Sequence, residues 1–350
     1  MPETDSDGIM GKSTIEHVAR QAGVSVATVD RVLNGRAAVK PNTVARVEKA
    51  IRLLNYQPDR LAARLARAKD YRFCFVLPEG SNGFMIALGE AVRATAAHMA
   101  QEKVVIDMRL TDVFDAETLA RTLDEIGGIY DGVAVVALDH PRVREAINGL
   151  AERGVAVVTL VSDVPASRRA HYVGIDNAAA GRTAATLMGR FLGERRGKVG
   201  LIAGSLSLRD HIERQFGFEQ VILHEYPNLM LLPVREGRDD WQRVEAVARQ
   251  LLADHADLIG IYNVGAGTRG IVAALEALGR QKSTVYIAHE LMDDSRRALI
   301  DGTIDSIINQ DAGHEVRSAI RVLMSKADKS PIVEAMERIR VDIYVRDNIP

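Results

Sequence analysis

One side of a short predicted helix carries side chains that can read DNA bases. Its outward-facing residues are Val26, Ala27, Asp30 and Arg31. Of these, Arg31 alone can form a bidentate contact with guanine in the major groove, and Val26 and Ala27 can contact a thymine methyl group. Asp30 fits less well, because a carboxylate beside phosphate lowers affinity unless Arg31 neutralises it or a cytosine amino group donates to it. The pattern predicts a recognition helix for double-stranded DNA.

Three short helices are predicted to position this surface. A hydroxyl at Ser13 or Thr14 caps the first, Gly23 allows a tight turn, Ser25 caps the second, and start signals precede a third helix over Val44 to Leu54. The inward positions recur at helical spacing: Ile15, Val18, Ala19, Ala22, Val29, Val32, Leu33, Val44, Val47, Ile51 and Leu54. Helix, short glycine turn and helix together predict an all-α helix-turn-helix headpiece.

The charge distribution agrees with a DNA role. Between Gly11 and Lys69 the chain has twelve Lys or Arg and four Asp or Glu, a net charge of +8, so the overall net of −2 leaves −10 in the rest. A basic module on an acidic body is expected where a protein contacts phosphate. For the helix pattern alone, a three-helix domain without a DNA role is the alternative.

Residues 14–35, TIEHVARQAGVSVATVDRVLNG, and 54–66, LNYQPDRLAARLA, resemble the headpiece and hinge helix of the lactose-repressor (LacI/GalR) family of bacterial transcription regulators without a gap. The resemblance implies that Pro58 opens a hinge helix, Asp59 to Arg67, which orders on operator DNA and inserts Leu65 into the minor groove. An ordinary amphipathic linker helix is the alternative for this segment. The residues expected to contact DNA are Thr14, Ser25, Val26, Ala27, Thr28, Asp30, Arg31, Asn34, Arg60 and Leu65.

Past the hinge, apolar segments of strand length alternate with helical segments. Strands are predicted over 73–77, 104–110, 133–138, 155–160, 199–203, 230–234, 258–264, 285–289 and 304–309. Helices are predicted over 84–101, 116–126, 142–153, 178–192, 209–224, 241–253 and 268–278. This alternation predicts an α/β fold of two doubly wound parallel-sheet lobes with a cleft between them. The loop over 162–170 is predicted to lead from one lobe to the other, and the stretch IINQDAGHEVRSAIRVL to return to the first.

Most of residues 71–346 resemble the effector-binding core of the same family, which is itself similar to type I periplasmic sugar-binding proteins. The motifs VGIDN with Gly181, RQFGF, IYNVG, AHE and INQD carry the resemblance. It implies ligand contacts at Arg214, Asn263, Glu290 and Gln310. Their chemistry suits a sugar, polyol or sugar acid, because a guanidinium donates to vicinal hydroxyl groups, a carboxylate accepts from them, and amides do both.

Further ligand contacts are predicted near the ends of strands. Ser81, Asn82 and Phe84 follow the first strand and offer hydrogen bonds and a flat apolar face; His289 adjoins Glu290, and Asp163 and Asp176 are either contacts or cap and turn residues. The predicted ligand-binding residues are Ser81, Asn82, Phe84, Asp163, Arg214, Asn263, His289, Glu290 and Gln310.

No catalytic residues, cofactor or metal are predicted. The chain lacks G-x-S-x-G, H-E-x-x-H and P-loop motifs, its nine histidines show no paired metal spacing, and its one cysteine, Cys74, lies in an apolar strand. The alternative is a dehydrogenase, because residues 265–270, GAGTRG, match the dinucleotide motif G-x-G-x-x-G and Glu290 lies 20 residues beyond Gly270. The motif occurs late in the chain, whereas a dinucleotide-binding domain has it after its first strand. This position favours another role for the glycines, which is to let the start of a helix approach the cleft.

The sequence therefore predicts a non-enzymatic, ligand-responsive transcriptional regulator. The expected domains are a headpiece over 1–57, a hinge and linker over 58–70, and a core over 71–346 whose lobes span about 71–162 plus 310–326 and about 175–305. We expect a cytoplasmic homodimer, without membrane contact, that represses a carbohydrate or polyol operon from a palindromic operator. A secreted sugar-binding protein is the rival, disfavoured by the basic headpiece and the lack of a signal peptide.

Overall fold

A computed structural model describes residues 13–33, 39–56 and 70–350. The chain divides at Lys69–Asp70 into two compact units, and each is described by itself. The predicted hinge helix and the contacts expected from Asn34, Arg60 and Leu65 lie outside the described residues.

The first unit contains α1 (Ile15–Ala22), α2 (Val26–Leu33) and α3 (Pro41–Leu53). Thr14 caps α1, and Gly23 ends it in the left-handed conformation at φ 62°, which suits a residue without a side chain. The third helix begins before the predicted Val44, because Pro41 already has the φ that a first helical residue needs. Five predicted inward positions, Val18, Ala19, Ala22, Val29 and Val47, are buried, and the other six are partly buried; Ala50, which was not predicted, is buried with them.

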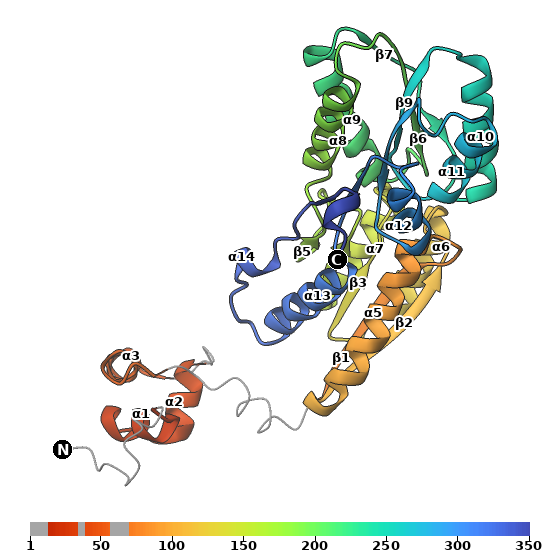
Figure 1. The fold of residues 1–350 in the computed structure, drawn as a ribbon. Helices are drawn as coiled ribbons and strands as arrows, with labels where there is room; N and C mark the ends of the chain where they lie inside the picture. The colour runs from red at the N-terminus through yellow and green to blue at the C-terminus, as the bar shows by residue number, and fades with distance from the viewer. Residues whose placement is uncertain (1–12, 34–38, 57–69) are drawn as a thin grey trace. The chain divides into compact units, whose positions relative to one another are not determined.

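The second unit begins with a parallel five-stranded sheet in the order β2-β1-β3-β4-β5. Its strands are β1 (Tyr71–Pro78), β2 (Val104–Thr111), β3 (Gly132–Val135), β4 (Ala156–Leu160) and β5 (His171–Val173). The associated helices are α5 (Gly83–Met99), η1 (Ala100–Glu102), α6 (Ala116–Ile126), α7 (Pro141–Glu152) and α13 (Ala312–Ala327). Alternate residues of β1 point to opposite faces: Cys74 and Val76 pack with α6 and α7, and Phe73 and Phe75 with α5 and α13. Figure 1 shows the strands and helices of this lobe.

A second sheet repeats this topology in the order β12-β11-β10-β9-β6-β7, with β8 also paired to β6. Its strands are β6 (Gly197–Ala203), β7 (Leu229–Leu231), β8 (Arg235–Glu236), β9 (Leu258–Asn263), β10 (Val285–His289), β11 (Ser306–Asn309) and the antiparallel β12 (Asp342–Tyr344). The associated helices are α8 (Asn177–Leu192), α9 (Arg209–Glu225), α10 (Trp241–Asp254), α11 (Thr268–Ala277) and α12 (Asp293–Ile300); two short helices, α14 (Glu334–Glu337) and η2 (Arg346–Asn348), flank β12. The predicted pair of doubly wound parallel α/β lobes is confirmed, with β12 as the one antiparallel strand of the described residues.

The chain passes from the first sheet to the second after β5, returns to the first with α13 after β11, and crosses once more to add β12 to the second sheet. The passage lies later than predicted, because β5 pairs with β4 and keeps residues 162–170 within the first lobe. Neither β5 nor β12 was predicted; each has three residues, too few to show an alternating pattern.

Candidate ligand cleft and recognition helix

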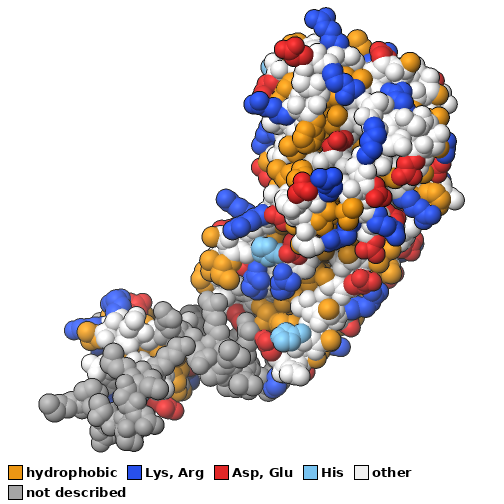
Figure 2. Space-filling view, viewed as in Figure 1, with side chains coloured by type: hydrophobic (Ala, Val, Ile, Leu, Met, Phe, Trp, Pro, Cys, Tyr) orange, Lys and Arg blue, Asp and Glu red, His pale blue; other side chains and the backbone are white. Residues whose placement is uncertain are grey.

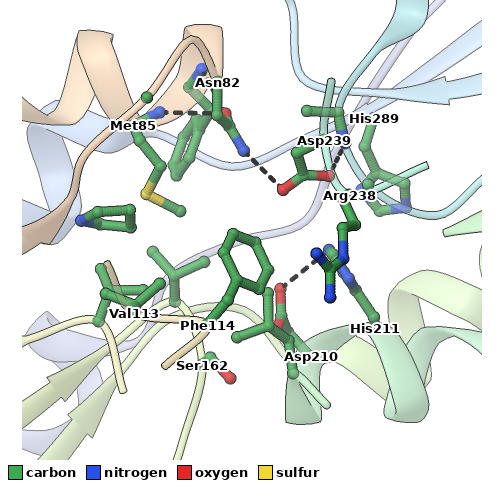
Figure 3. A pocket seen from close by; sticks show the side chains of 18 of the residues that line it. Asn82, Met85, Val113, Phe114, Ser162, Asp210, His211, Arg238, Asp239 and His289 are labelled. Carbon is green, nitrogen blue, oxygen red and sulfur yellow. Dashed lines mark hydrogen bonds and ion pairs between the residues drawn. The ribbon is translucent and has the colours of Figure 1, made fainter. Parts of the chain in front are cut away.

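A cavity of about 200 Å³ lies where the carboxyl ends of strands from both sheets meet (Figure 3). Pro78 comes from the end of β1, Val161 follows β4, Glu290 follows β10 and Gln310 follows β11. In each sheet the strand order reverses beside its first strand, between β1 and β3 and between β6 and β9. Open α/β sheets bind ligands at this kind of switch point.

Arg214 forms the charged centre of the cavity wall. Its guanidinium is buried, with Nε donating to Asn177 Oδ1 at 2.8 Å and Nη1 to the Val264 carbonyl at 3.0 Å, while Nη2 has no partner among the described residues. Burial favours the neutral form, but the carboxylates of Asp210 and Glu290 outweigh it and raise the pKa of Arg214. The side chain is therefore a fixed cation whose Nη2 group is free to donate to a ligand.

The support beneath Arg214 continues to the segment that joins the lobes. Asn177, the first residue of α8, donates to the Tyr172 hydroxyl at 3.1 Å, and the single O–H of Tyr172 can donate to the carbonyl of Val161 at 2.9 Å or of Ile175 at 3.1 Å. We call Arg214, Asn177 and Tyr172 the crossover chain. It connects the wall of the cavity with the strand and loop through which the polypeptide leaves the first lobe.

Glu290 occupies an uncommon backbone conformation. Its φ is 66°, in the left-handed region that non-glycine residues rarely adopt, and its N–H donates to the Ile308 carbonyl at 2.9 Å. The carboxylate accepts from Gln310 Nε2 at 2.8 Å. Burial raises the pKa of Glu290 to about 7, against the opposing effects of Arg214 and Gln310.

His289 is a neutral imidazole with one free nitrogen. Its Nε2 lies 2.7 Å from the Tyr262 hydroxyl, and its Nδ1 has no partner in the described part of the chain. Burial, assisted by the nearby Arg214 and His211, lowers the pKa of His289 well below its usual value. The ring can therefore donate to or accept from a ligand without carrying charge.

Unpartnered buried polar atoms gather at this cavity. Among the described residues twelve buried side-chain nitrogen or oxygen atoms have no hydrogen-bond partner, and five of them belong to lining residues. These five are Ser162 Oγ, Asp210 Oδ1, Arg214 Nη2, His289 Nδ1 and Gln310 Oε1. Leaving a buried polar group unpaired costs about 1–3 kcal/mol, so the concentration of such groups indicates a site that a polar ligand completes.

Seven of the nine predicted ligand residues line the cavity: Ser81, Asn82, Phe84, Arg214, His289, Glu290 and Gln310. Asp163 does not; it is bonded to Arg169 and to the Thr159 hydroxyl within the first lobe. Asn263 is buried below the lining, where its Nδ2 donates to the Ala266 carbonyl and the Thr268 hydroxyl, both at 3.3 Å. Asp176 caps α8 by accepting from the Ala179 N–H.

Sequence reasoning missed several lining residues, among them Asp210, His211, Arg238 and Asp239. Asp210 precedes Arg214 by four positions on α9, and this helical spacing is a signal that places both on one face. Arg238 and Asp239 both adopt left-handed φ values, 52° and 55°, between β8 and α10. Asp239 joins the lobes, since its Oδ2 accepts from Asn82 Nδ2 at 3.0 Å and its Oδ1 from the Ala266 N–H at 3.0 Å.

The glycines of residues 265–270 have packing explanations. Gly267 adopts φ 86° at the start of α11, and a Cβ at Gly270 would lie 2.2 Å from the Trp241 carbonyl oxygen. In a dinucleotide-binding site an acidic residue at this spacing would bind the ribose, but here the Glu290 carboxylate accepts a hydrogen bond from Gln310. The motif thus brings α11 close to α10 and to the cleft.

In the first unit, most of the residues predicted to contact DNA lie on α2 or just before it. Ser25, Val26, Ala27 and Arg31 are exposed, and Val26 is 41% exposed although apolar. Thr28 is partly buried, with its N–H donating to Ser25 Oγ at 3.2 Å, and Asp30 is partly buried as well. Thr14, also predicted to contact DNA, is exposed at the start of α1.

One face of residues 70–350 has a surface of mixed charge. On the face of residues 70–350 shown in Figure 2, acidic and basic side chains are interspersed over both lobes. Within the described ranges, no helix is long and apolar enough to cross a membrane, and no group of three His, Cys, Asp or Glu side chains is placed to hold a metal ion.

A helix-turn-helix unit joined to two lobes around a polar cleft defines a class of protein: a ligand-binding regulator that contacts DNA. Comparison with known families agrees, since residues 14–59 match the model of bacterial regulatory proteins of the lacI family and residues 73–331 match a periplasmic binding protein domain. The chain belongs to the lacI family of transcriptional regulators and carries a periplasmic-binding-protein-type domain. This is a family of regulators and not of enzymes.

Individual relatives support this assignment. The chain is 27% identical to the HTH-type transcriptional regulator GalS of Salmonella typhimurium over 258 residues, 73% of each protein. It is 30% identical to catabolite control protein A of Streptococcus mutans over 193 residues, 55% of each. Among solved structures, a glucose-galactose binding protein from Geobacillus stearothermophilus, GanP, superposes with a TM-score of 0.73 at 21% identity, over 81% of this chain and 99% of that one. At this identity the last match shows the fold alone.

Proposed function

We propose that the protein is a dimeric repressor whose affinity for a palindromic operator is controlled by a small, uncharged polyhydroxylated effector, a sugar or polyol. The observation that carries the effector class is the set of five unpartnered buried atoms in the cleft, two acceptors, one donor and two groups able to do either. Hydroxyl groups both donate and accept, so one polyol can satisfy all five. The comparison structures include a solute-binding protein from Burkholderia graminis in complex with D-arabinose, which supports the same class.

The charges of the cavity argue against the sugar acids considered from the sequence. Asp210 and Glu290 already balance Arg214, and Asp210 Oδ1 is one of the unpartnered atoms. A ligand carboxylate would bring a further negative charge toward this pair in a buried setting, where like charges repel strongly. An uncharged ligand avoids that cost.

In this proposal DNA is contacted by α2, with Arg31, Val26 and Ala27 reading bases, and by the segment over 58–67, with Leu65 in the minor groove and Arg60 at the phosphates. In a symmetric dimer two such headpieces meet half-sites about one helical turn apart. An effector that binds one lobe arrangement better than another shifts the equilibrium between DNA-competent and incompetent states by that difference in affinity. Such a regulator acts in the cytoplasm, where its operator lies.

The substitution Ser162→Ala tests whether the cleft binds the effector without lowering the stability of the fold. Ser162 is buried and its hydroxyl has no partner, so its removal is expected to leave the ligand-free protein as stable as before, or up to about 1–2 kcal/mol more stable. Loss of a hydrogen bond to the effector is expected to weaken binding about tenfold, since roughly 1.4 kcal/mol corresponds to a factor of ten.

A thermal-shift screen of sugars and polyols identifies the effector. Calorimetry then measures the affinity of the effector for wild type and for Ser162→Ala. Fluorescence anisotropy measures operator binding in the presence and absence of the effector. Ser167→Ala, in the same loop but outside the cavity lining, is the matched control and is expected to keep wild-type affinity. If Ser162→Ala bound the effector with wild-type affinity, the cleft would not be the effector site. An effector that leaves operator affinity unchanged would remove the regulatory role.

A further inference from the structure

A second cavity, of about 310 Å³, adjoins the first. The two share walls at Asn82, Phe84, Asp239, His289 and Glu290, and they meet at the hydrogen bond between Asn82 and Asp239. We call the 200 Å³ cavity the inner chamber and the 310 Å³ cavity the outer chamber. Since the outer chamber is the larger of the two, a ligand confined to the inner one would leave more than half of the cleft to water.

The inner chamber has the size of one sugar ring, and the outer chamber has room for a second. A water-sized unit occupies roughly 10–15 Å³ of such volume, so the inner chamber holds on the order of a dozen non-hydrogen atoms and the outer one about twenty. A single pyranose ring with its hydroxyl groups has about a dozen such atoms, which fills the inner chamber and cannot extend into the outer one.

The wall of the outer chamber has the chemistry of a sugar-binding surface. Trp241 contributes an indole, and the guanidinium of Arg269 lies 4.4 Å from the centre of its ring. Met292 adds apolar surface, and Asp239 adds a carboxylate. A sugar ring has an apolar C–H face and a rim of hydroxyl groups, which these apolar and polar groups can match together.

Trp241 is held in place by the fold. It is the first residue of α10, whose N-cap Asp240 accepts from the Arg243 N–H at 2.9 Å, and its carbonyl packs against Gly270 of α11. It is also the only tryptophan of the chain, so its fluorescence reports on the outer chamber without interference from another indole. An aromatic side chain fixed on a helix terminus loses little freedom when a ligand contacts it.

We propose that the physiological ligand is a two-ring glycoside, a disaccharide, with one ring in the inner chamber beside Arg214 and the second in the outer chamber beside Trp241. The linkage between the rings passes Asn82 and Asp239, whose mutual hydrogen bond is exchanged for bonds to the ligand. The proposal rests on the proposed function, since it assumes that the cleft binds a carbohydrate effector.

The experiment compares matched pairs of probes on the full-length protein. Calorimetric titrations are made with glucose, galactose, xylose and arabinose, and with maltose, cellobiose, lactose, melibiose and xylobiose. At least one disaccharide is expected to bind ten times or more as tightly as each monosaccharide that it contains, and to change Trp241 fluorescence more than either.

Variants then locate the second ring. Trp241→Ala is expected to abolish the tenfold advantage of the disaccharide while changing monosaccharide affinity less than twofold, and Trp241→Phe to keep part of the advantage. Phe216→Ala is the matched control, because Phe216 is an exposed aromatic residue, 63% exposed, outside both chambers; both affinities should stay as in wild type.

The outcomes distinguish this proposal from the proposed function. Monosaccharides that bind as tightly as every disaccharide containing them, or a Trp241→Ala variant that weakens both classes equally, would show that the outer chamber is an entrance filled by water. Absence of binding by every sugar of both classes would overturn the proposed carbohydrate effector itself, and the two-ring ligand with it.

Discussion

At the scale of single residues, the cleft is built from groups held in states that a free side chain would not choose. Glu290 has a left-handed backbone and a pKa near 7, His289 is held neutral, and Arg214 keeps its charge while buried. Such strain and perturbed ionisation concentrate at functional sites, since the rest of the fold must supply the energy to maintain them.

Glu290 makes the stability of the ligand-free protein depend on pH. Because burial raises its pKa from 4.5 to about 7, the folded protein holds this proton more tightly than the unfolded chain does. Protonated Glu290 therefore contributes up to roughly 3 kcal/mol to the free energy of unfolding. This contribution is complete below about pH 4.5 and is lost as the pH rises through 7. Glu290→Gln cannot ionise, so its free energy of unfolding is expected to fall less than that of wild type between pH 5 and pH 8.

Urea unfolding of wild type and Glu290→Gln at both pH values measures this difference, and groups common to both proteins cancel. Glu90→Gln, exposed on α5, controls for the loss of one negative charge. Parallel pH profiles for wild type and Glu290→Gln would show that Glu290 ionises alike in the folded and unfolded states.

At the scale of elements, α8 and α9 are packed so closely that two glycines are required between them. A Cβ at Gly181 would lie 2.0 Å from the Arg214 carbonyl oxygen, and one at Gly217 would lie 2.1 Å from that of Ala178. Because α9 carries Arg214 and α8 carries Asn177, the distance between the two helices sets the position of Arg214 relative to its hydrogen-bond partner. The packing of the helices therefore also determines where Arg214 lies in the cavity wall.

Gly181→Ala is therefore expected to force the helices apart and to destabilise the protein by about 1–3 kcal/mol or more, together with a loss of effector binding. Gly149→Ala on α7 is the matched control, because its Cβ would meet only the flexible end of Arg153 at 3.4 Å. Alanine in a helix interior stabilises by roughly 0.5–1 kcal/mol relative to glycine, so this control should rise in stability. Denaturant unfolding measures both, and a Gly181→Ala variant as stable as Gly149→Ala would contradict the packing argument.

Much of the architecture was predictable from local pattern. The strand over 285–289 and the helix over 116–126 have the predicted bounds, because apolar periodicity and caps such as Asp115 specify them within the segment. The sequence did not reveal α12 or the helical character of α13, nor the cavity positions of Arg238 and Asp239. Those positions depend on how a turn of one lobe approaches the other, which only the assembled fold determines.

At the scale of the whole chain, the two units have separate hydrophobic cores. The core of α1–α3 consists of six buried residues, all Ala or Val, whereas three larger clusters fill residues 70–350. A domain of this small size buries little apolar area and is only marginally stable by itself. We therefore expect two unfolding transitions on heating, the first of them small.

Far-ultraviolet circular dichroism should record both transitions, and Trp241 fluorescence only the upper one, since the single tryptophan lies in the second unit. Operator DNA should raise the lower transition and effector the upper one, because a ligand stabilises the unit that it binds. Coincident transitions by both probes would show that the two units unfold cooperatively.

The crossover chain has a consequence for how this regulator can change during evolution or redesign. Arg214 lines the cavity and, through Asn177 and Tyr172, also supports the segment between the lobes. Replacing it to accept a new sugar therefore alters the strength of the response together with its chemical preference. Ser162 and Asp210 line the same cavity and are not part of that set of hydrogen bonds. A library aimed at new effectors should therefore vary these two positions and retain the arginine.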